Sequence, residues 1–197
     1  SLVGSEMCIR DRFSGCSTFN INISTWDVSA VTDMNSMFSG CINFNQDLRY
    51  WDVSNVIDMN SMFRGCSSYD ETLLAWNYHL GNVRDMGYMF CDCSNFNRRL
   101  DYWDISRVTN FQSMFKGCSN YNKSPPVIDT SNTSNVNMKS MFSGCSNFNQ
   151  NISNWDVSGV TNMNSMFRDC SNFNQELKNW DVSAVKDMNS MFRGCIS

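Results

Sequence analysis

The chain has 197 residues, a net charge of −4 and few charged side chains, since Asp, Glu, Lys and Arg make up only 17% of it. No block of Lys and Arg supplies the positive surface that DNA- and RNA-binding proteins present to phosphates, so a nucleic-acid partner is not expected. The sequence contains no apolar run of about 18 residues, so no membrane-spanning helix is predicted.

The first twelve residues, SLVGSEMCIRDR, do not follow the pattern of the rest of the chain. Residues 1–12 are predicted to be a non-repeat segment, similar to a translated sequencing adapter, and are left out of the fold prediction. Because the chain begins without Met and ends at Ser197 in the middle of a repeat, we expect it to be an interior fragment of a longer protein.

Residues 13–197 are copies of one unit, which is clearest from Trp51 to Ala75 as WDVSNVIDMNSMFRGCSSYDETLLA. A cysteine marks the same place in each copy, at steps of 25 or 27 residues: Cys16, Cys41, Cys66, Cys93, Cys118, Cys145, Cys170 and Cys195. A fixed period of this size is typical of solenoids, whose repeats bury their apolar faces against their neighbours. The sequence therefore predicts one solenoid domain over residues 13–197, with about seven coils and two open ends.

The first element predicted within each unit is a short helix or 3₁₀ turn. Its apolar residues have the spacing of one helical face: Val56, Met59, Met62, Phe63 and Cys66. Asp58 precedes the first methionine, where its carboxylate is expected to cap the helix. Gly65 lies near the expected helix end, where a positive φ is common.

The second predicted element is a short strand around Trp51 and Val53, whose alternation places these two side chains inward and Asp52 outward. Stacked on the strands of neighbouring coils, it would form a narrow parallel sheet. Between the two elements lies a column of Asn or Asp, expected to bond to the backbone of the next coil. This column contains Asn20, Asn45, Asp70, Asn97, Asn122, Asn149 and Asn174.

The eight repeated cysteines lie beside apolar columns, which favours a ladder of buried free thiols. Disulfide bonds between neighbouring coils remain the alternative. Cys8 and Cys91 lie outside the ladder and are predicted to be the more accessible thiols.

Two repeats are longer by two residues. The first, WNYHLGNVRDM, contains His79, the only histidine of the chain; the second contains Pro125 and Pro126, which cannot donate backbone hydrogen bonds. Insertions in solenoids occur in loops on one face, which is often the binding face. Neutral variation in a tolerant loop is the alternative interpretation.

The repeat template W-D-V-S-x-V-x-D-M-x-x-M-F-x-G-C-S-x-F-N-Q-x-L resembles the repeat of bacterial surface lipoproteins, which is similar to BspA-like leucine-rich repeats. One copy of it contains Trp155, Asp156, Val157, Ser158, Met163, Met166, Phe167, Cys170, Phe173, Asn174 and Leu177. The resemblance covers residues 13–197. It implies a leucine-rich-repeat-like solenoid, located extracellularly on a cell surface, that acts in adhesion or interaction. It brings no catalytic residues with it.

A column of outward carboxylates follows the tryptophans, with Asn77 as its one exception: Asp27, Asp52, Asp104, Asp129, Asp156 and Asp181. Stacked about 4.8 Å apart, neighbouring carboxylates would repel each other. Each Asp is expected to bond to the Ser two residues later in an Asx turn. The alternative is a column that binds Ca²⁺.

No catalytic activity and no cofactor are predicted, because His79 has no nearby partner in the sequence for a catalytic triad and no pair of cysteines has zinc-site spacing. We expect a monomeric array that binds a protein or glycan partner, with contacts from Tyr50, Asp52, Tyr78, His79, Tyr102 and Asp104. A spacer stiffened by Ca²⁺ is the second hypothesis. An ice- or crystal-binding face is a third and remote one.

Overall fold

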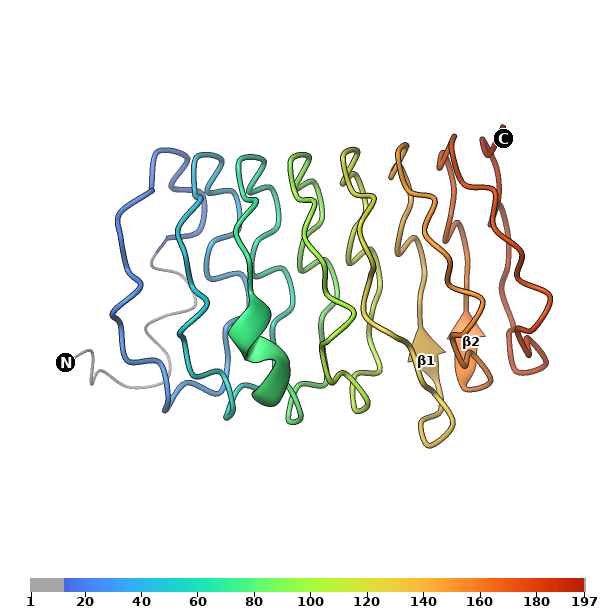
Figure 1. Cartoon of the computed structure of the whole chain (residues 1–197), viewed down its shortest axis with the longest axis horizontal. Helices are drawn as coiled ribbons and strands as arrows, with labels where there is room; N and C mark the ends of the chain where they lie inside the picture. The colour runs from blue at the N-terminus through green and yellow to red at the C-terminus, as the bar shows by residue number, and fades with distance from the viewer. Residues whose placement is uncertain (1–12, 197) are drawn as a thin grey trace.

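The computed structural model of the chain describes residues 13–196. The chain winds through successive coils that stack side by side along one axis, so that the first and last described coils lie at opposite ends of an elongated stack (Figure 1). Equivalent residues of adjacent coils form parallel bridges, as in Asp33 to Asp58 and Asp58 to Asp85. The predicted repeat fold is therefore confirmed.

Regular secondary structure is sparse in residues 13–196. The 3₁₀ helix η2 spans Leu74–Tyr78, and two short parallel strands, β1 at Val136–Asn137 and β2 at Val160–Asn162, pair with each other (Figure 1). No helix in this range is long and apolar enough to cross a membrane. The expectation of one helix and one strand in every coil is wrong, and the coils consist mainly of turns.

The predicted helix fails because the backbone N–H groups alternate between two kinds of partner. The N–H groups of Met59, Ser61 and Phe63 donate to carbonyls of the next coil, at 2.8–2.9 Å. Those of Met62 and Arg64 donate to carbonyls three residues earlier in their own coil. Ser61, at φ 57°, is in the left-handed region, which ends a right-handed helix. The helical spacing correctly predicts the buried face but not the backbone.

The predicted strand has the expected side-chain directions without the expected pairing. Trp51 and Val53 are buried and Asp52 is exposed. The parallel bridges form instead in the column that contains Asp58, the residue expected above to cap the helix. The only bridge in the predicted strand column, among residues 13–196, joins Asp129 to Asp156. The carboxylates of the bridging column accept from the N–H two residues later, as Asp58 does from Asn60 at 2.8 Å, so they form Asx turns.

Stacked aromatic rings make a continuous core along the axis. The ring of Phe63 lies 4.4 Å from that of Tyr69 in its own coil and 5.5 Å from that of Phe90 in the next coil. Tyr69 and Tyr121 take places that Phe fills in other coils, and their buried hydroxyl groups have no hydrogen-bond partner. The core is therefore long and apolar, and these two hydroxyl groups are among the few polar atoms that burial leaves unsatisfied.

The cysteine ladder consists of free thiols, and those of the interior coils are buried. From Cys41 to Cys195, each ladder Sγ–H donates to a Phe carbonyl of the preceding coil, as Cys145 does to Phe115 at 2.9 Å. Burial raises the pKa of the Cys41 thiol to about 11 and that of Cys145 well above its usual value. Cys16, at the first described coil, is exposed.

Cys8 and Cys91, the two cysteines outside the ladder, were predicted to be the more accessible thiols. The prediction is wrong for Cys91. Cys91 is only 3% exposed, because it lies on the buried side of a tight turn, and burial raises its pKa to about 12. Cys8 lies outside the described residues, as does the whole segment 1–12.

The predicted role of the Asn column is confirmed. Each side-chain oxygen accepts the backbone N–H of its equivalent in the next coil, for example Asn20 from Asn45 at 2.9 Å and Asn45 from Asp70 at 2.8 Å. The same bond recurs through Asn97, Asn122, Asn149 and Asn174. The column links neighbouring coils at a turn that would otherwise leave donors unpaired.

Candidate functional site

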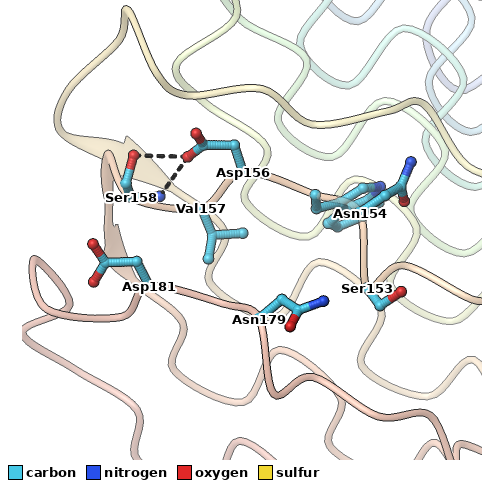
Figure 2. Close-up of a pocket in the computed structure, with 8 residues that line it drawn as sticks. Ser153, Asn154, Asp156, Val157, Ser158, Asn179 and Asp181 are labelled. Atoms are coloured by element: carbon cyan, nitrogen blue, oxygen red, sulfur yellow. Dashed lines mark hydrogen bonds between the residues drawn. The ribbon is translucent and has the colours of Figure 1, made fainter.

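The outward Asp column is held by its own turns. Asp52 accepts the N–H of Ser54 at 3.0 Å, and Asp156 accepts both the N–H and the hydroxyl of Ser158 at 2.9 and 2.7 Å (Figure 2). These Ser hydrogen bonds lower the pKa of Asp52, and equivalent bonds lower the pKa of Asp27, Asp129 and Asp181. The expected Asx turns are therefore confirmed.

The Ca²⁺ hypothesis requires several oxygen ligands around one point. In the part of the chain that the structure describes, no three side chains of His, Cys, Asp or Glu converge in this way. Asp156 and Asp181 lie on neighbouring coils, and Asp156 points towards its own Ser158 (Figure 2). Ca²⁺ binding by the column stays a prediction, and no ligand set supports it among these residues.

His79, and not Asn77, takes the place of the missing aspartate in the column. Leu80 fills the buried position after it, as Val53 does after Asp52, because Asn77 and Tyr78 are the inserted residues and lie within η2. The imidazole Nδ1 of His79 lies 3.2 Å from Oδ1 of Asp52. The two predicted contact residues are therefore neighbours, and the histidine interrupts the row of carboxylates.

A second acidic column was missed as a functional feature because its members were interpreted as helix caps. Asp58 lies between Asp33 and Asp85 of the adjacent coils. Burial, more than the neighbouring carboxylates, raises the pKa of Asp58. Asp85 accepts side-chain N–H groups from Asn60 and Asn110 at 2.9–3.0 Å. The column is internally bonded and shows no ligand site.

The surface between the Asn column and the Trp column of each coil, here called the Leu–Trp face, carries a groove beside η2. This η2 groove has a volume of about 530 Å³ and is open to solvent. It is lined by Thr72, Leu74, Asn97, Arg98, Arg99, Tyr102 and Lys123. It spans three consecutive coils and contains one of the contact residues predicted from the sequence, Tyr102.

The two-residue insertion in the coil of η2 has a visible effect next to the groove. The indole N–H groups of Trp51, Trp76 and Trp180 donate to a backbone carbonyl of the preceding coil at 2.9–3.1 Å. That of Trp103, which follows the coil with the insertion, is buried and has no partner. The equivalent acceptor would be the Leu73 carbonyl, directly before η2. The insertion has therefore disturbed the regular stacking here.

Two of the three cations in the η2 groove are fixed by carboxylates. Arg98 donates to the carboxylate of Asp70 at 2.8 Å, and Arg99 binds both oxygens of Asp101 at 2.7 and 3.1 Å. Lys123 has no ion pair within residues 13–196. Three cations and two carboxylates leave the groove a local charge of +1. Arg98 and Arg99 each keep some N–H groups free of protein partners, since a guanidinium has about five N–H donors.

An equivalent groove lies on the Leu–Trp face two coils from the C-terminal end. It has a volume of about 340 Å³ and is lined by Asn151, Ser153, Asn174, Gln175, Glu176, Lys178 and Asn179. Here Gln175 and Glu176 stand in the places of Arg98 and Arg99, and Asn179 in that of Tyr102. Lys178 pairs with Glu176 at 3.0 Å, so this amide groove has no excess positive charge.

A third groove, of about 370 Å³, adjoins the amide groove. Ser153, Asn154 and Asn179 lie on one side of it and the Asp156 and Asp181 carboxylates on the other, with Val157 between (Figure 2). Trp155 also contributes to its lining. Its charge is negative, so two grooves on the same pair of neighbouring coils differ in chemistry.

The remaining contact residues predicted from the sequence do not line the η2 groove. Tyr50 and Tyr78 are strongly exposed, at 78% and 86%, and the Arg49 guanidinium lies 5.8 Å from the Tyr50 ring. Asp104 is bonded to Ser106 in its own turn. The sequence analysis missed Arg98, Arg99 and Lys123. Their signal was available, since they are the only basic residues in two columns that other coils fill with Gln, Asn, Asp or Glu or with Ile21, Thr72 and Ser124.

Comparison with known protein families agrees with the repeat. The family described as "Mycoplasma protein of unknown function, DUF285" matches three times, over residues 7–80, 77–137 and 126–197. The chain belongs to this family. The three overlapping matches extend the DUF285 repeat along nearly the whole chain, including both longer repeats. No curated protein matches the sequence.

Proposed function

We propose that this DUF285 chain is a non-catalytic recognition array, which binds a protein or glycan partner through its Leu–Trp face. In this proposal the coil stack is a solenoid of the leucine-rich-repeat-like kind found in BspA-like bacterial surface lipoproteins, and it acts as a monomer on the outside of a cell. The sequence resemblance over residues 13–197 is the support for this finer assignment and for the location.

One observation carries the proposal: grooves recur at related places on the Leu–Trp face, and their side chains differ from coil to coil. The side chains that build the coils are by contrast nearly constant and are bonded internally, as the Asn and Cys columns are. A constant scaffold with variable grooves is what an extended binding surface requires. Large exposed side chains on or beside the same face, Tyr50, Leu74 and Tyr78, add apolar contact area.

A binding screen tests the proposal. The purified chain is immobilised and presented with a panel of matrix proteins and glycans, and a Tyr50→Ser variant serves as the probe of the face. We expect at least one partner to be retained by the chain and retained less by this variant. Lys116→Ser, in a turn outside the Leu–Trp face, is the matched control and should bind like the unchanged chain. Retention of nothing above a scrambled-surface control would overturn the proposal.

A further inference from the structure

The η2 groove combines three features that the two other grooves described above lack together. It has an aromatic ring, that of Tyr102; it has an apolar side chain, Leu74, exposed at the start of η2; and it has an excess of positive charge from Lys123. Thr72 and Asn97 add polar groups along its length. We propose that this groove binds a glycan that carries a carboxylate, of the uronic-acid class. The inference rests on the proposed binding function and names its ligand chemistry.

The cations of the groove are arranged for a single carboxylate. Arg99 is held by both oxygens of Asp101, and Arg98 by the backbone oxygen and carboxylate of Asp70. These bonds fix the two guanidinium groups before a ligand arrives, which lowers the entropy lost on binding. A guanidinium that already uses two donors can still bind a carboxylate through its remaining N–H groups. Lys123 then supplies the charge that no carboxylate of residues 13–196 pairs with.

The local charge of +1 favours one negative group over many. A uronic-acid residue brings one carboxylate on a ring with an apolar face, and that face can lie against the ring of Tyr102. An acidic peptide brings a denser negative charge into a chain whose net charge is already −4. It would meet the carboxylates of Asp70 and Asp101 as well, so repulsion opposes it.

The remaining polar groups of the groove suit the hydroxyls of a sugar. Burial raises the pKa of the Tyr102 hydroxyl, and the nearby side chain of Thr72 offsets part of this rise, so the two residues lie together in the groove. Asn97 uses its side-chain oxygen to accept the N–H of Asn122 at 2.9 Å, and this bond fixes the amide with its Nδ2 group as the remaining donor. Donors and acceptors held in place beside an aromatic ring and a cation form a built site for a charged sugar.

Calorimetric titration of the full chain with an oligosaccharide that carries a single galacturonic-acid residue tests the proposal. Its neutral methyl ester and a poly-glutamate peptide are titrated in parallel. We expect the oligosaccharide to bind and both comparison ligands to bind at least about tenfold more weakly, which corresponds to one charge-assisted contact. Equal binding of the methyl ester, tighter binding of the peptide, or no binding of the oligosaccharide would overturn the proposal.

Two variants locate the site. Lys123→Gln removes the unpaired cation at an exposed position and is expected to weaken oligosaccharide binding by roughly tenfold. Lys178→Gln removes the cation that lines the amide groove and should leave the affinity unchanged. Unchanged melting temperatures establish that both variants are folded. An equal loss of oligosaccharide affinity in both variants would show that the binding site lies outside the η2 groove. If the screen of the Leu–Trp face finds a partner while this titration fails, the binding function stands and the uronate assignment falls.

Discussion

Tyr69 and Tyr121 are the two residues that place a hydroxyl group in the stacked aromatic column of the core. Both have fully buried hydroxyl groups without a partner in a column that Phe occupies elsewhere. An unsatisfied buried polar group costs about 1–3 kcal/mol. Tyr69→Phe is therefore expected to raise the free energy of unfolding by an amount in that range, measured by chemical denaturation.

The opposite substitution in the same column is the control for this prediction. Phe148→Tyr adds a hydroxyl to a buried ring in the same stack and should lower the free energy of unfolding. If Tyr69→Phe destabilises the chain as much as Phe148→Tyr does, the hydroxyl of Tyr69 has a partner in solution and the packing of the column differs from that described above.

A second residue-scale prediction concerns Asp58. Its pKa is raised in the folded chain, mainly by burial, so its contribution to stability is full below the unfolded pKa and is lost as the pH rises through the folded pKa. At neutral pH the ionised carboxylate therefore costs stability. Asp58→Asn keeps the oxygen that accepts the N–H of Asn60 and removes the charge. We expect a gain of up to about 1 kcal/mol at pH 7, which disappears when the pH is lowered below the unfolded pKa of about 3.9.

Asp187 provides the matched control, since it lies in the same column but has a lowered pKa, owing to hydrogen bonds from the N–H of Asn189 and the side chain of Asn164. The contribution of the Asp187 carboxylate to the stability of the fold is present above the unfolded pKa and is lost as the pH falls through the folded pKa. Asp187→Asn should give no gain at pH 7. A gain of equal size in both variants would show that removal of any charge stabilises the column, irrespective of burial.

At the scale of elements, η2 is the main irregularity among the described coils, and it lies beside the groove with the most distinctive chemistry. Deletion of Asn77 and Tyr78 restores the 25-residue step between Cys66 and the next ladder cysteine. Trp103 should then regain a carbonyl acceptor in the preceding coil, as Trp76 has. We expect thermal melting to show a gain in stability of about 1 kcal/mol, the contribution of one hydrogen bond.

The same deletion should weaken oligosaccharide binding, because Leu74 and Thr72 would move relative to Tyr102 and the η2 groove would change shape. Removal of two residues from the regular loop around Ser153 and Asn154, which contains no insertion, is the control and should destabilise the chain. A loss of stability on deletion of Asn77 and Tyr78 would contradict the view that these two residues are an insertion into a regular coil.

The elements also show how far the sequence can predict this fold. The repeat, its buried columns and the inter-coil bonds of Asn45 follow from periodicity alone. Helix and strand were mispredicted because residues three apart share a buried face in a series of turns as well as in a helix. Only the partner of each N–H distinguishes the two, and for Met59 and Phe63 that partner is in the next coil. The grooves were not predictable for the same reason: they depend on how neighbouring coils meet.

Across the whole molecule, the thiol ladder determines whether packing or covalent bonds hold the coils together. The interior thiols are buried and donate to carbonyls, and burial raises the pKa of the Cys66 thiol, so the reactive thiolate is scarce. In a Cys8→Ser background, a thiol reagent should label Cys16 rapidly in the native chain and Cys66, Cys91 and Cys145 only after unfolding. Mass spectrometry of peptides measures the labelling. Rapid native labelling of Cys145, or a disulfide under non-reducing conditions, would contradict the described ladder.

At the scale of the whole molecule, we propose that the Leu–Trp face of the coil stack binds the partner and that the other faces do not. NMR of the ¹⁵N-labelled chain, with the partner recovered from the binding screen added stepwise, tests it most directly. The account predicts that shifts concentrate on the Leu–Trp face, around Arg98, Tyr102 and Lys123, while the turns around Ser39 and Lys116 stay unchanged. Shifts centred on those turns, or spread evenly over all coils, would contradict it.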